Sequence, residues 1–497
     1  MAVCLTAPLI LSTAADPPRT RLLEGREDGR TASFTQLVAI GVGGVISGDF
    51  FGWQAALAGG FWNGLVALLL VSVFYCGLCL SVAEVAATLT TATGPAQFAR
   101  LCLGPRCAFA VAVAESLKIL LVVAVITVGV AAYLVEIVRY DAAWSPLVWL
   151  LVLLLDAALL MLGGALSLNV QCALTGGAVA MLLTFYGAAL AQPPELALAT
   201  NGSAPAPWSN ELDAAGVLAS CPFCFWFFLG AEELPLARPL AREPRLLAPA
   251  LKLTLACLTV LAFCTYVLSS TIAPGAAELS LRPYPLLEGY RACFGDSSAT
   301  NYACLVLTTG LVSSLHSFLF AAGEMLSACA DDGYLPAVLA WHSTRAHTPV
   351  TALAFAAIAA YSAVLTLHYA IDDDLVLGAV LMTAVLAAAM VSYLAQLACF
   401  LVLRHNEEQP SNSNDRSLLG RPGAMVTIGL ACASIGCVGS LCFQRQEYAY
   451  GPALSGVAAL LWGGVYLSRG PMSRVLQNCC SRPSTSSQAE GPERLDS

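Results

Sequence analysis

Long apolar runs alternate with short polar segments along most of this chain. Twelve of these runs are about 20 residues or longer, which is the length that an α-helix needs to cross a bilayer. The pattern predicts an all-α integral membrane protein with twelve transmembrane helices. The predicted spans are 34–57, 62–89, 108–137, 144–163, 168–190, 214–233, 249–271, 300–328, 349–367, 374–403, 422–443 and 451–468.

Composition supports a membrane protein and argues against a soluble domain or a nucleic-acid-binding protein. Of the 497 residues, 58% are hydrophobic and 11% are charged, whereas soluble domains carry about 25% charged residues. The net charge of −9 and the lack of a basic stripe argue against a nucleic-acid partner. We expect one membrane domain, 34–468, in the lipid bilayer between disordered tails at 1–33 and 469–497. The first tail shows no cleavable signal peptide.

The basic residues predict how the chain is oriented. If the N-terminus lies inside, eighteen of the 23 Lys and Arg residues fall in cytoplasmic segments, four fall outside, and Lys118 lies within a span. The positive-inside rule therefore predicts that both termini are cytoplasmic. Asn201-Gly-Ser then lies in an outer loop, where it is a candidate glycosylation site. We expect the plasma membrane, with a lysosomal or other endomembrane location as the alternative.

The first span is interrupted by glycines between Gly41 and Gly52. Glycine weakens a helix and frees backbone groups, which a membrane tolerates only where they line a cavity or are buried in protein. Asp49 is costly at that depth, so a solvated or ligand-filled site explains it best. The alternatives are close helix packing for the glycines, and a helix cap or a salt bridge to Lys118 for Asp49. The candidate substrate-binding residues of this segment are Gly44, Ser47, Gly48, Asp49 and Phe50.

The sixth span carries a second interruption, between Cys221 and Glu233, where Pro222 and Gly230 bracket an aromatic run. A pair of interrupted helices in corresponding positions is typical of secondary transporters built from inverted repeats. We therefore predict a 5+5 inverted-repeat fold with repeats over 34–190 and 213–403, followed by helices 11 and 12. The aromatic run could instead be a packed or interfacial patch. The candidate substrate-binding residues here are Phe225, Trp226, Phe228 and Gly230.

Several further motifs resemble those of the amino acid–polyamine–organocation superfamily of permeases. They are the segment Ala83–Arg100, the residues Glu232, Glu243-Pro244 and Pro249, and the pattern Asp332-Gly-Tyr-Leu-Pro336 with Thr348-Pro349. The resemblance covers residues 34–403. Within the superfamily, Val45–Trp53 and Cys224–Glu232 are most similar to bacterial-type ethanolamine permeases. The resemblance implies a LeuT-type fold with broken helices 1 and 6 and transport by alternating access.

Asp49 also indicates the class of substrate. In permeases of this superfamily the glycine-rich break of helix 1 offers free N–H groups to a substrate carboxylate. The carboxylate of Asp49 would repel such a group and attract an ammonium. We therefore predict a transporter for a small cationic amine such as ethanolamine, or for an amino acid, with Ser47 or a backbone group binding the hydroxyl.

Two other functions stay open at this point. A cationic amino acid or polyamine transporter is the second candidate, and a nutrient receptor that does not transport is the third. A membrane enzyme fits least well, because the sequence shows no nucleophile–base pair, metal cluster or phosphate loop. No cofactor is expected.

The resemblance implies that the protein either exchanges substrates or couples their transport to a proton or to sodium. Span 168–190 contains no Lys, which is the residue that proton-coupled relatives often use there. Glu232 is the first candidate for proton linkage. Glu115 and Lys118 are further candidates, although three-residue spacing also allows a structural ion pair on one helix face. The remaining coupling candidates are Ser313, His316, Ser317 and Glu324. The two serines could instead form hydrogen bonds between helices.

The 19 cysteines indicate neither a disulfide framework nor a metal site. Most lie in apolar spans, where Cys behaves as a small hydrophobic residue. Cys221 and Cys224 have no second ligand pair for zinc. Cys293 and Cys304 both lie near the predicted outer face, so a disulfide between them is an open question.

Overall fold

The computed structural model describes residues 31–192, 211–343, 348–371, 374–407, 420–444 and 446–480. The chain divides into two compact units at Ser455, and the contacts given below belong to the first unit. Asn201 and most of both predicted tails lie outside the described residues. Within the described residues the only extended pairing is an isolated bridge between Ala32 and Ala241, so the observed class is all-α.

Long helices account for most of the described chain. Their bounds are α2 (Phe34–Val45), α3 (Phe61–Thr88), α5 (Pro105–Val138), α6 (Ser145–Leu162), α7 (Gly164–Ala191), α9 (Ala214–Cys224), α10 (Leu247–Thr271), α14 (Thr308–Asp331), α15 (Val350–Ala370), α16 (Asp374–Glu407), α17 (Gly420–Gln444) and α18 (Gln446–Cys480). Shorter helices are α4 (Pro95–Cys102), α11 (Ala276–Leu279), α12 (Pro285–Phe294) and α13 (Ser298–Ala303).

The described residues contain ten helices that are long and apolar enough to cross a membrane, and a shorter apolar helix at Phe34–Asp49. The prediction of twelve full spans is therefore met in part. The first predicted span, 34–57, is divided into α2 and two short 3-10 segments, Ile46–Asp49 and Gln54–Gly59. The twelfth, 451–468, lies in α18, which is not among the ten.

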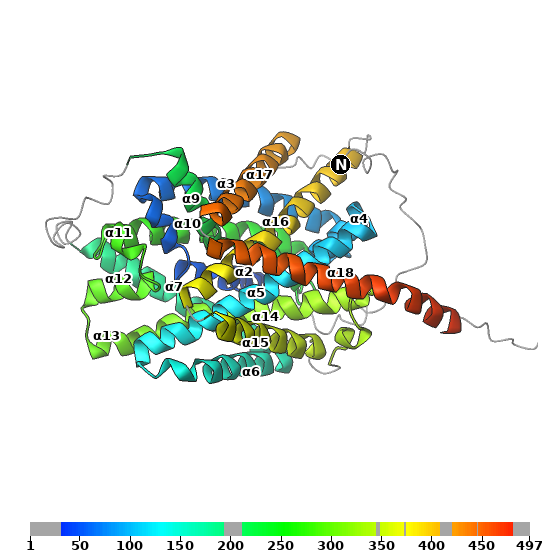
Figure 1. The fold of residues 1–497 in the computed structure, drawn as a ribbon, viewed down its shortest axis with the longest axis horizontal. Coiled ribbons are helices and arrows are strands. Elements are labelled where there is room, and N and C mark those ends of the chain that lie inside the picture. Colours follow the sequence, from blue (N-terminus) through cyan, green and yellow to red (C-terminus); the bar gives the residue numbers. More distant parts are fainter. Residues whose placement is uncertain are drawn as a thin grey trace, which may run out of the picture. The chain divides into compact units, whose positions relative to one another are not determined.

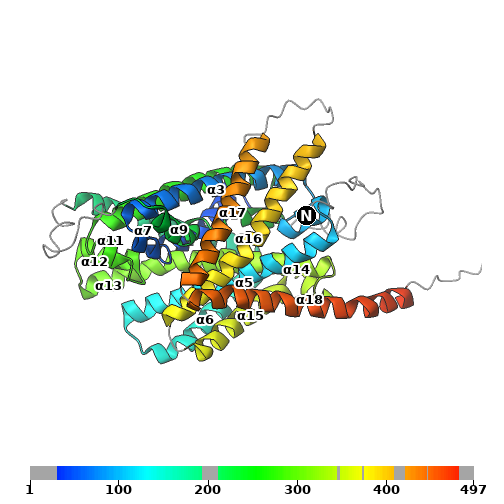
Figure 2. The same cartoon turned by 45° about the horizontal axis from the view of Figure 1, so that its top comes forward.

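Helix α5 lies at the centre of the packing, with α14 and α16 against it (Figure 1). Helix α2 packs against α7, α10 and α14, so the short first helix is enclosed by three longer ones. Figure 2 shows α16 and α17 running side by side, in agreement with their direct contact. By contrast, α6 and α7 expose large apolar side chains such as Leu155 and Leu190, as expected for faces in contact with lipid.

Arg238 follows the second interruption and ties it to the end of α3. Its guanidinium donates to the carbonyl oxygens of Ala86 and Thr90, the latter at 3.0 Å. Those carbonyls belong to the last turn of α3 and the residues just after it, where they lack helical partners and favour a cation. Burial lowers the pKa of Arg238 to about 10, so the side chain stays charged at neutral pH.

Candidate functional site

Both predicted interruptions are present. Helix α2 ends at Val45 and the chain continues as the 3-10 segment η2 (Ile46–Asp49) before turning. Helix α9 contains Pro222, ends at Cys224 and continues as η5 (Phe225–Phe227), then turns into η6 (Ala231–Ala237). Gly230, at the start of η6, has a φ of 98°, a conformation that side chains other than glycine rarely adopt.

The two interruptions touch each other through their backbones. A Cβ atom added to Gly48 would lie 2.0 Å from the carbonyl oxygen of Trp226, so only glycine fits there. The neighbouring rings also meet across this contact: Phe51 and Trp226 have centroids 6.4 Å apart, and Trp53 and Phe227 have centroids 5.4 Å apart. The break in α2 and the break after α9 therefore form one structural unit.

Asp49 lies in this unit and is fully buried. Its Oδ1 accepts a hydrogen bond from Thr265 Oγ1 on α10 at 2.7 Å, and Thr265 Oγ1 also bonds the hydroxyl of Tyr186 at 2.7 Å. The other oxygen, Oδ2, has no hydrogen-bond partner among the described residues. The alternative of a salt bridge between Asp49 and Lys118 is wrong, because the partners of Lys118 are three other carboxylates.

The serines of α14 hydrogen-bond the α2 segment. Ser314 donates to the carbonyl of Gly43 at 2.8 Å and accepts from the backbone N–H of Ser47 at 3.0 Å. Ser317 donates to the carbonyl of Ile40 at 3.1 Å. Because α2 stops at Val45, the carbonyl of Gly43 lies in its last turn, where helical donors run out, and the Ser314 hydroxyl supplies a donor.

Ser313 and His316 face different neighbours from Ser314 and Ser317. Ser313 lies 3.0 Å from both Thr175 Oγ1 and Gln171 Nε2 on α7. His316 is buried between two other helices, with Nδ1 at 2.6 Å from Asp156 Oδ1 and Nε2 at 2.8 Å from Ser167 Oγ. The sequence did not single out Asp156, although it is a lone carboxylate in an apolar span.

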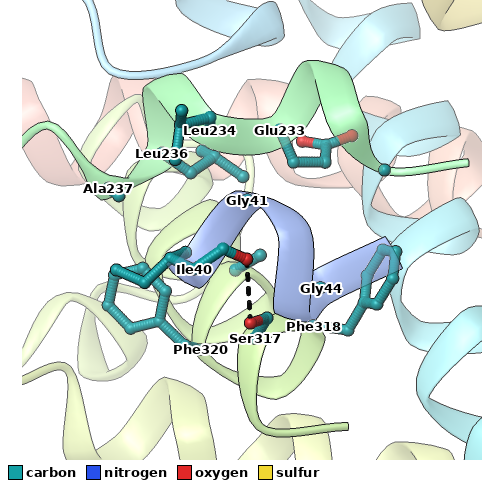
Figure 3. A pocket seen from close by; sticks show the side chains of 12 residues that line it. Ile40, Gly41, Gly44, Glu233, Leu234, Leu236, Ala237, Ser317, Phe318 and Phe320 are labelled. Carbon is teal, nitrogen blue, oxygen red and sulfur yellow. Dashed lines mark hydrogen bonds between the residues drawn. The ribbon is translucent and has the colours of Figure 1, made fainter. Parts of the chain in front are cut away.

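A pocket opens beside the two interruptions, and its space of about 340 Å³ includes the open solvent at its mouth. Figure 3 shows Glu233, Leu234 and Leu236 of η6 on one side, Ser317, Phe318 and Phe320 of α14 on the other, and α2 between them. Three predicted site residues line it, namely Gly44, Gly230 and Ser317. The complete lining is Ile40, Gly41, Gly44, Gly230, Glu233, Leu234, Leu236, Ala237, Ser317, Phe318, Phe320 and Ala321.

The other predicted binding residues do not line this pocket. Phe50 is fully buried, and its ring lies where a side chain on Gly310 would have to fit. Phe225 and Phe228 pack against Tyr75, with ring centroids 5.6 and 5.3 Å apart, so their surroundings are those of core residues. The remaining four, Ser47, Gly48, Asp49 and Trp226, lie at the contact between the two interruptions.

A second group of polar residues is centred on the ammonium of Lys118. Lys118 Nζ lies 2.6 Å from Glu115 Oε1 and 2.7 Å from Glu232 Oε1, and it also pairs with Glu233. The predicted ion pair between Glu115 and Lys118 is therefore present. Glu232 was a candidate from the sequence, whereas Glu233 was not. Glu233 belongs to the site because η6 places both carboxylates beside α5.

Two aromatic hydroxyls complete this group. The hydroxyls of Tyr75 on α3 and Tyr393 on α16 lie 2.9 Å apart, and the Tyr393 ring centroid is 5.2 Å from Lys118 Nζ. Neither tyrosine carries a pattern in the sequence that marks it. Glu324, the last predicted coupling residue, is buried on α14 one turn beyond the pocket residue Ala321.

Four cysteines considered in the sequence are free thiols in the structure. Cys293 and Cys304 do not form a disulfide, which answers the question left open above. Cys221 and Cys224 are also free and buried.

Comparison with known proteins identifies the family to which the chain belongs. The sequence profile of the amino acid permease family matches residues 36–467, which is most of the chain. An uncharacterized transporter of Rhizobium meliloti (strain 1021) is 27% identical over 241 residues, covering 47% of this chain and 49% of that protein. The chain thus spans about half the length of this curated relative. Together with the apolar helices, these matches show that the chain is a multi-pass membrane protein that belongs to the amino acid permease family.

Proposed function

We propose that this protein is a secondary transporter that moves a small cationic amine, such as ethanolamine, across the membrane by alternating access, with proton linkage. The observation that carries the proposal is the fully buried carboxylate of Asp49, which has one oxygen without a donor and lies where two broken helices meet. A buried carboxylate in a membrane is costly unless a cation or hydrogen bonds balance it. The ammonium of a substrate would supply that balance.

The contact between Gly48 and Trp226 fits the alternating-access part of the proposal. In this conformation Asp49 is closed off from the pocket, and a substrate would reach it only when the two interruptions separate. Trp226 adds a buried indole N–H that has no acceptor among the described residues. A hydroxyl on the substrate is a suitable acceptor for it, which favours an amino alcohol over a simple alkylamine.

The family match supports membrane transport rather than enzymatic catalysis. A cationic amino acid or polyamine is the second candidate substrate, because its ammonium would pair equally well with Asp49. A nutrient receptor without transport is the third candidate. The orientation with both termini cytoplasmic and the plasma-membrane location remain parts of the proposal.

Uptake of labelled ethanolamine by cells that express this chain tests the proposal. Uptake should exceed that of control cells and should increase at acidic external pH. Asp49→Asn removes the charge that binds the ammonium, and loss of one partner of a buried ion pair costs about 3 kcal/mol or more. The ratio kcat/KM should therefore fall by about a hundredfold.

Asp296→Asn is the matched control, because this carboxylate lies on the outer segment between α12 and α13 and is well exposed. Its uptake should equal that of the wild type. Absence of uptake at either pH, with the protein detected at the cell surface, would reject ethanolamine in favour of lysine, arginine or polyamines. Uptake that Asp49→Asn leaves unchanged would reject Asp49 as the binding residue.

A further inference from the structure

The group around Lys118 is not balanced in charge. Glu115, Glu232 and Lys118 are fully buried, and Glu233 is 6% exposed. If every group is ionised, three carboxylates face one ammonium, which leaves two net negative charges. Isolated buried charges are so unfavourable that carboxyl groups take up protons instead. At least one proton therefore belongs to this group.

Glu232 has the surroundings of an ionised carboxylate. Its Oε1 lies 2.7 Å from Lys118 Nζ, and its Oε2 accepts the backbone N–H of Gly230 at 3.2 Å. Both oxygens thus have donors, and the donor at Oε1 is a cation. Hydrogen bonds to the charged form favour that form. These contacts direct the search for the proton to the other two carboxyl groups, although the sequence made Glu232 the first candidate.

Glu115 and Glu233 have different surroundings. Both pair with the same ammonium, Lys118 Nζ, so their carboxyl groups are close neighbours. Two ionised carboxylates offer only acceptors, so such a contact is favourable only when one of them carries a proton. Glu233 Oε2 is buried and has no donor among the described residues, although Glu233 lines the pocket. Glu115 therefore lies deep in the protein, whereas Glu233 lies at the pocket.

We propose that Glu115 and Glu233 share one proton, and that this pair is the proton-coupling site of the transporter. The proton would enter from water in the pocket at Glu233 Oε2 and leave by the same path, while Lys118 and Glu232 remain ionised as a fixed pair. This proposal rests on the proposed transport function for its coupling role. The presence of the shared proton does not depend on the substrate.

The groups that lie near this cluster on the surrounding helices are consistent with the assignment. Tyr75 and Cys79 on α3 and Tyr393 on α16 lie near the carboxylate of Glu232, and all three are neutral in their usual protonation states. Glu324 on α14 is the other buried carboxylate near the pocket. None of these groups supplies a second cation, and among the described residues the cation that pairs with the three carboxylates is Lys118.

Infrared spectroscopy of the purified full-length protein tests the shared proton without any substrate. The reference protein carries Asp49→Asn, as do all variants compared with it, because the buried carboxyl group of Asp49 would otherwise add an acid band of its own. The reference should show the carbonyl-stretch band of a protonated carboxylic acid at neutral pH, with the shift in D₂O that such a group gives. Glu115→Gln and Glu233→Gln should each abolish that band, because the remaining carboxylate then accepts a hydrogen bond from the new amide. Glu278→Gln, at a half-exposed surface ion pair with Arg282, should leave it intact.

Three results would overturn the shared proton: no acid band in the Asp49→Asn reference, a band that survives both single variants, or a band lost in Glu232→Gln but retained in Glu233→Gln. If either Glu115→Gln or Glu233→Gln does not fold, loss or survival of the band in the other variant decides. A second measurement tests the coupling role. Ethanolamine added to liposomes that contain the wild type should change the internal pH, and Glu233→Gln should reduce the pH change per molecule of ethanolamine taken up at least tenfold.

An equal pH change in the wild type and Glu233→Gln would reject the coupling role. Failure of the wild type to transport ethanolamine would reject the proposed function instead, and the infrared result would still decide whether Glu115 and Glu233 share a proton. The two failures are therefore distinguishable.

Discussion

Substitution of Gly48 by alanine tests whether the contact between the two interruptions is essential. The new methyl carbon would lie 2.0 Å from the carbonyl oxygen of Trp226 and 2.7 Å from its carbonyl carbon. Both are backbone atoms, so no side-chain rotation can relieve the clash. Overpacking in protein interiors costs about 1–3 kcal/mol, and we expect the upper end of this range because the backbone of η5 must shift.

Thermal unfolding of the purified protein, followed by uptake of ethanolamine, measures both consequences. Domains of 150–250 residues lose about 2–4 °C per kcal/mol, and this chain is longer, so a fall of about 2–6 °C is expected together with loss of uptake. Gly176→Ala is the matched control, because nothing lies within 4 Å of a Cβ at this exposed position of α7. The control should be as stable as the wild type or gain up to about 1 kcal/mol. Equal stability and uptake in Gly48→Ala and Gly176→Ala would refute the reasoning.

Three further predictions concern single contacts. Thr265→Val removes the donor to Asp49 Oδ1, and an unpaired buried acceptor costs about 1–3 kcal/mol. The variant should therefore have a higher KM for ethanolamine and a lower unfolding midpoint. Uptake and thermal unfolding measure these two quantities, and unchanged values would contradict the prediction. Arg238→Met should destabilise the protein by a similar amount, because two carbonyls at the end of α3 lose their donor; an unchanged unfolding midpoint would contradict this. His316→Leu should lower the unfolding midpoint, because Asp156 loses its His316 partner. Adding Asp156→Asn to His316→Leu should recover part of that loss. No recovery in the double variant would argue against an energetic coupling between His316 and Asp156.

The sequence was sufficient for the features that depend on local composition. Glycines between Gly41 and Gly52 and the Pro222…Gly230 segment predicted both interruptions, since glycine and proline act on the backbone where they stand. The three-residue spacing of Glu115 and Lys118 likewise predicted an ion pair that the structure contains. These are local properties, and they do not require knowledge of how the helices pack.

The sequence was insufficient where a contact depends on helices that are distant along the chain. Thr265 lies 216 residues from Asp49, and Asp156 lies 160 residues from His316. Nothing in the local pattern distinguishes Glu233 from Glu232, and the difference arises only because η6 directs one carboxylate to Gly230 and the other to the pocket. The aromatic run looked like one binding surface, yet Phe225 packs into the core beside Tyr75.

Counterflow in liposomes that contain the purified protein tests the central claim most directly. Liposomes are loaded with unlabelled ethanolamine, and labelled ethanolamine is added outside, so that accumulation of label requires a substrate site that alternates between the two sides. The account predicts accumulation with the wild type and with Asp296→Asn, competition by small amines, and no accumulation with Asp49→Asn. Equal accumulation with Asp49→Asn and the wild type would contradict it.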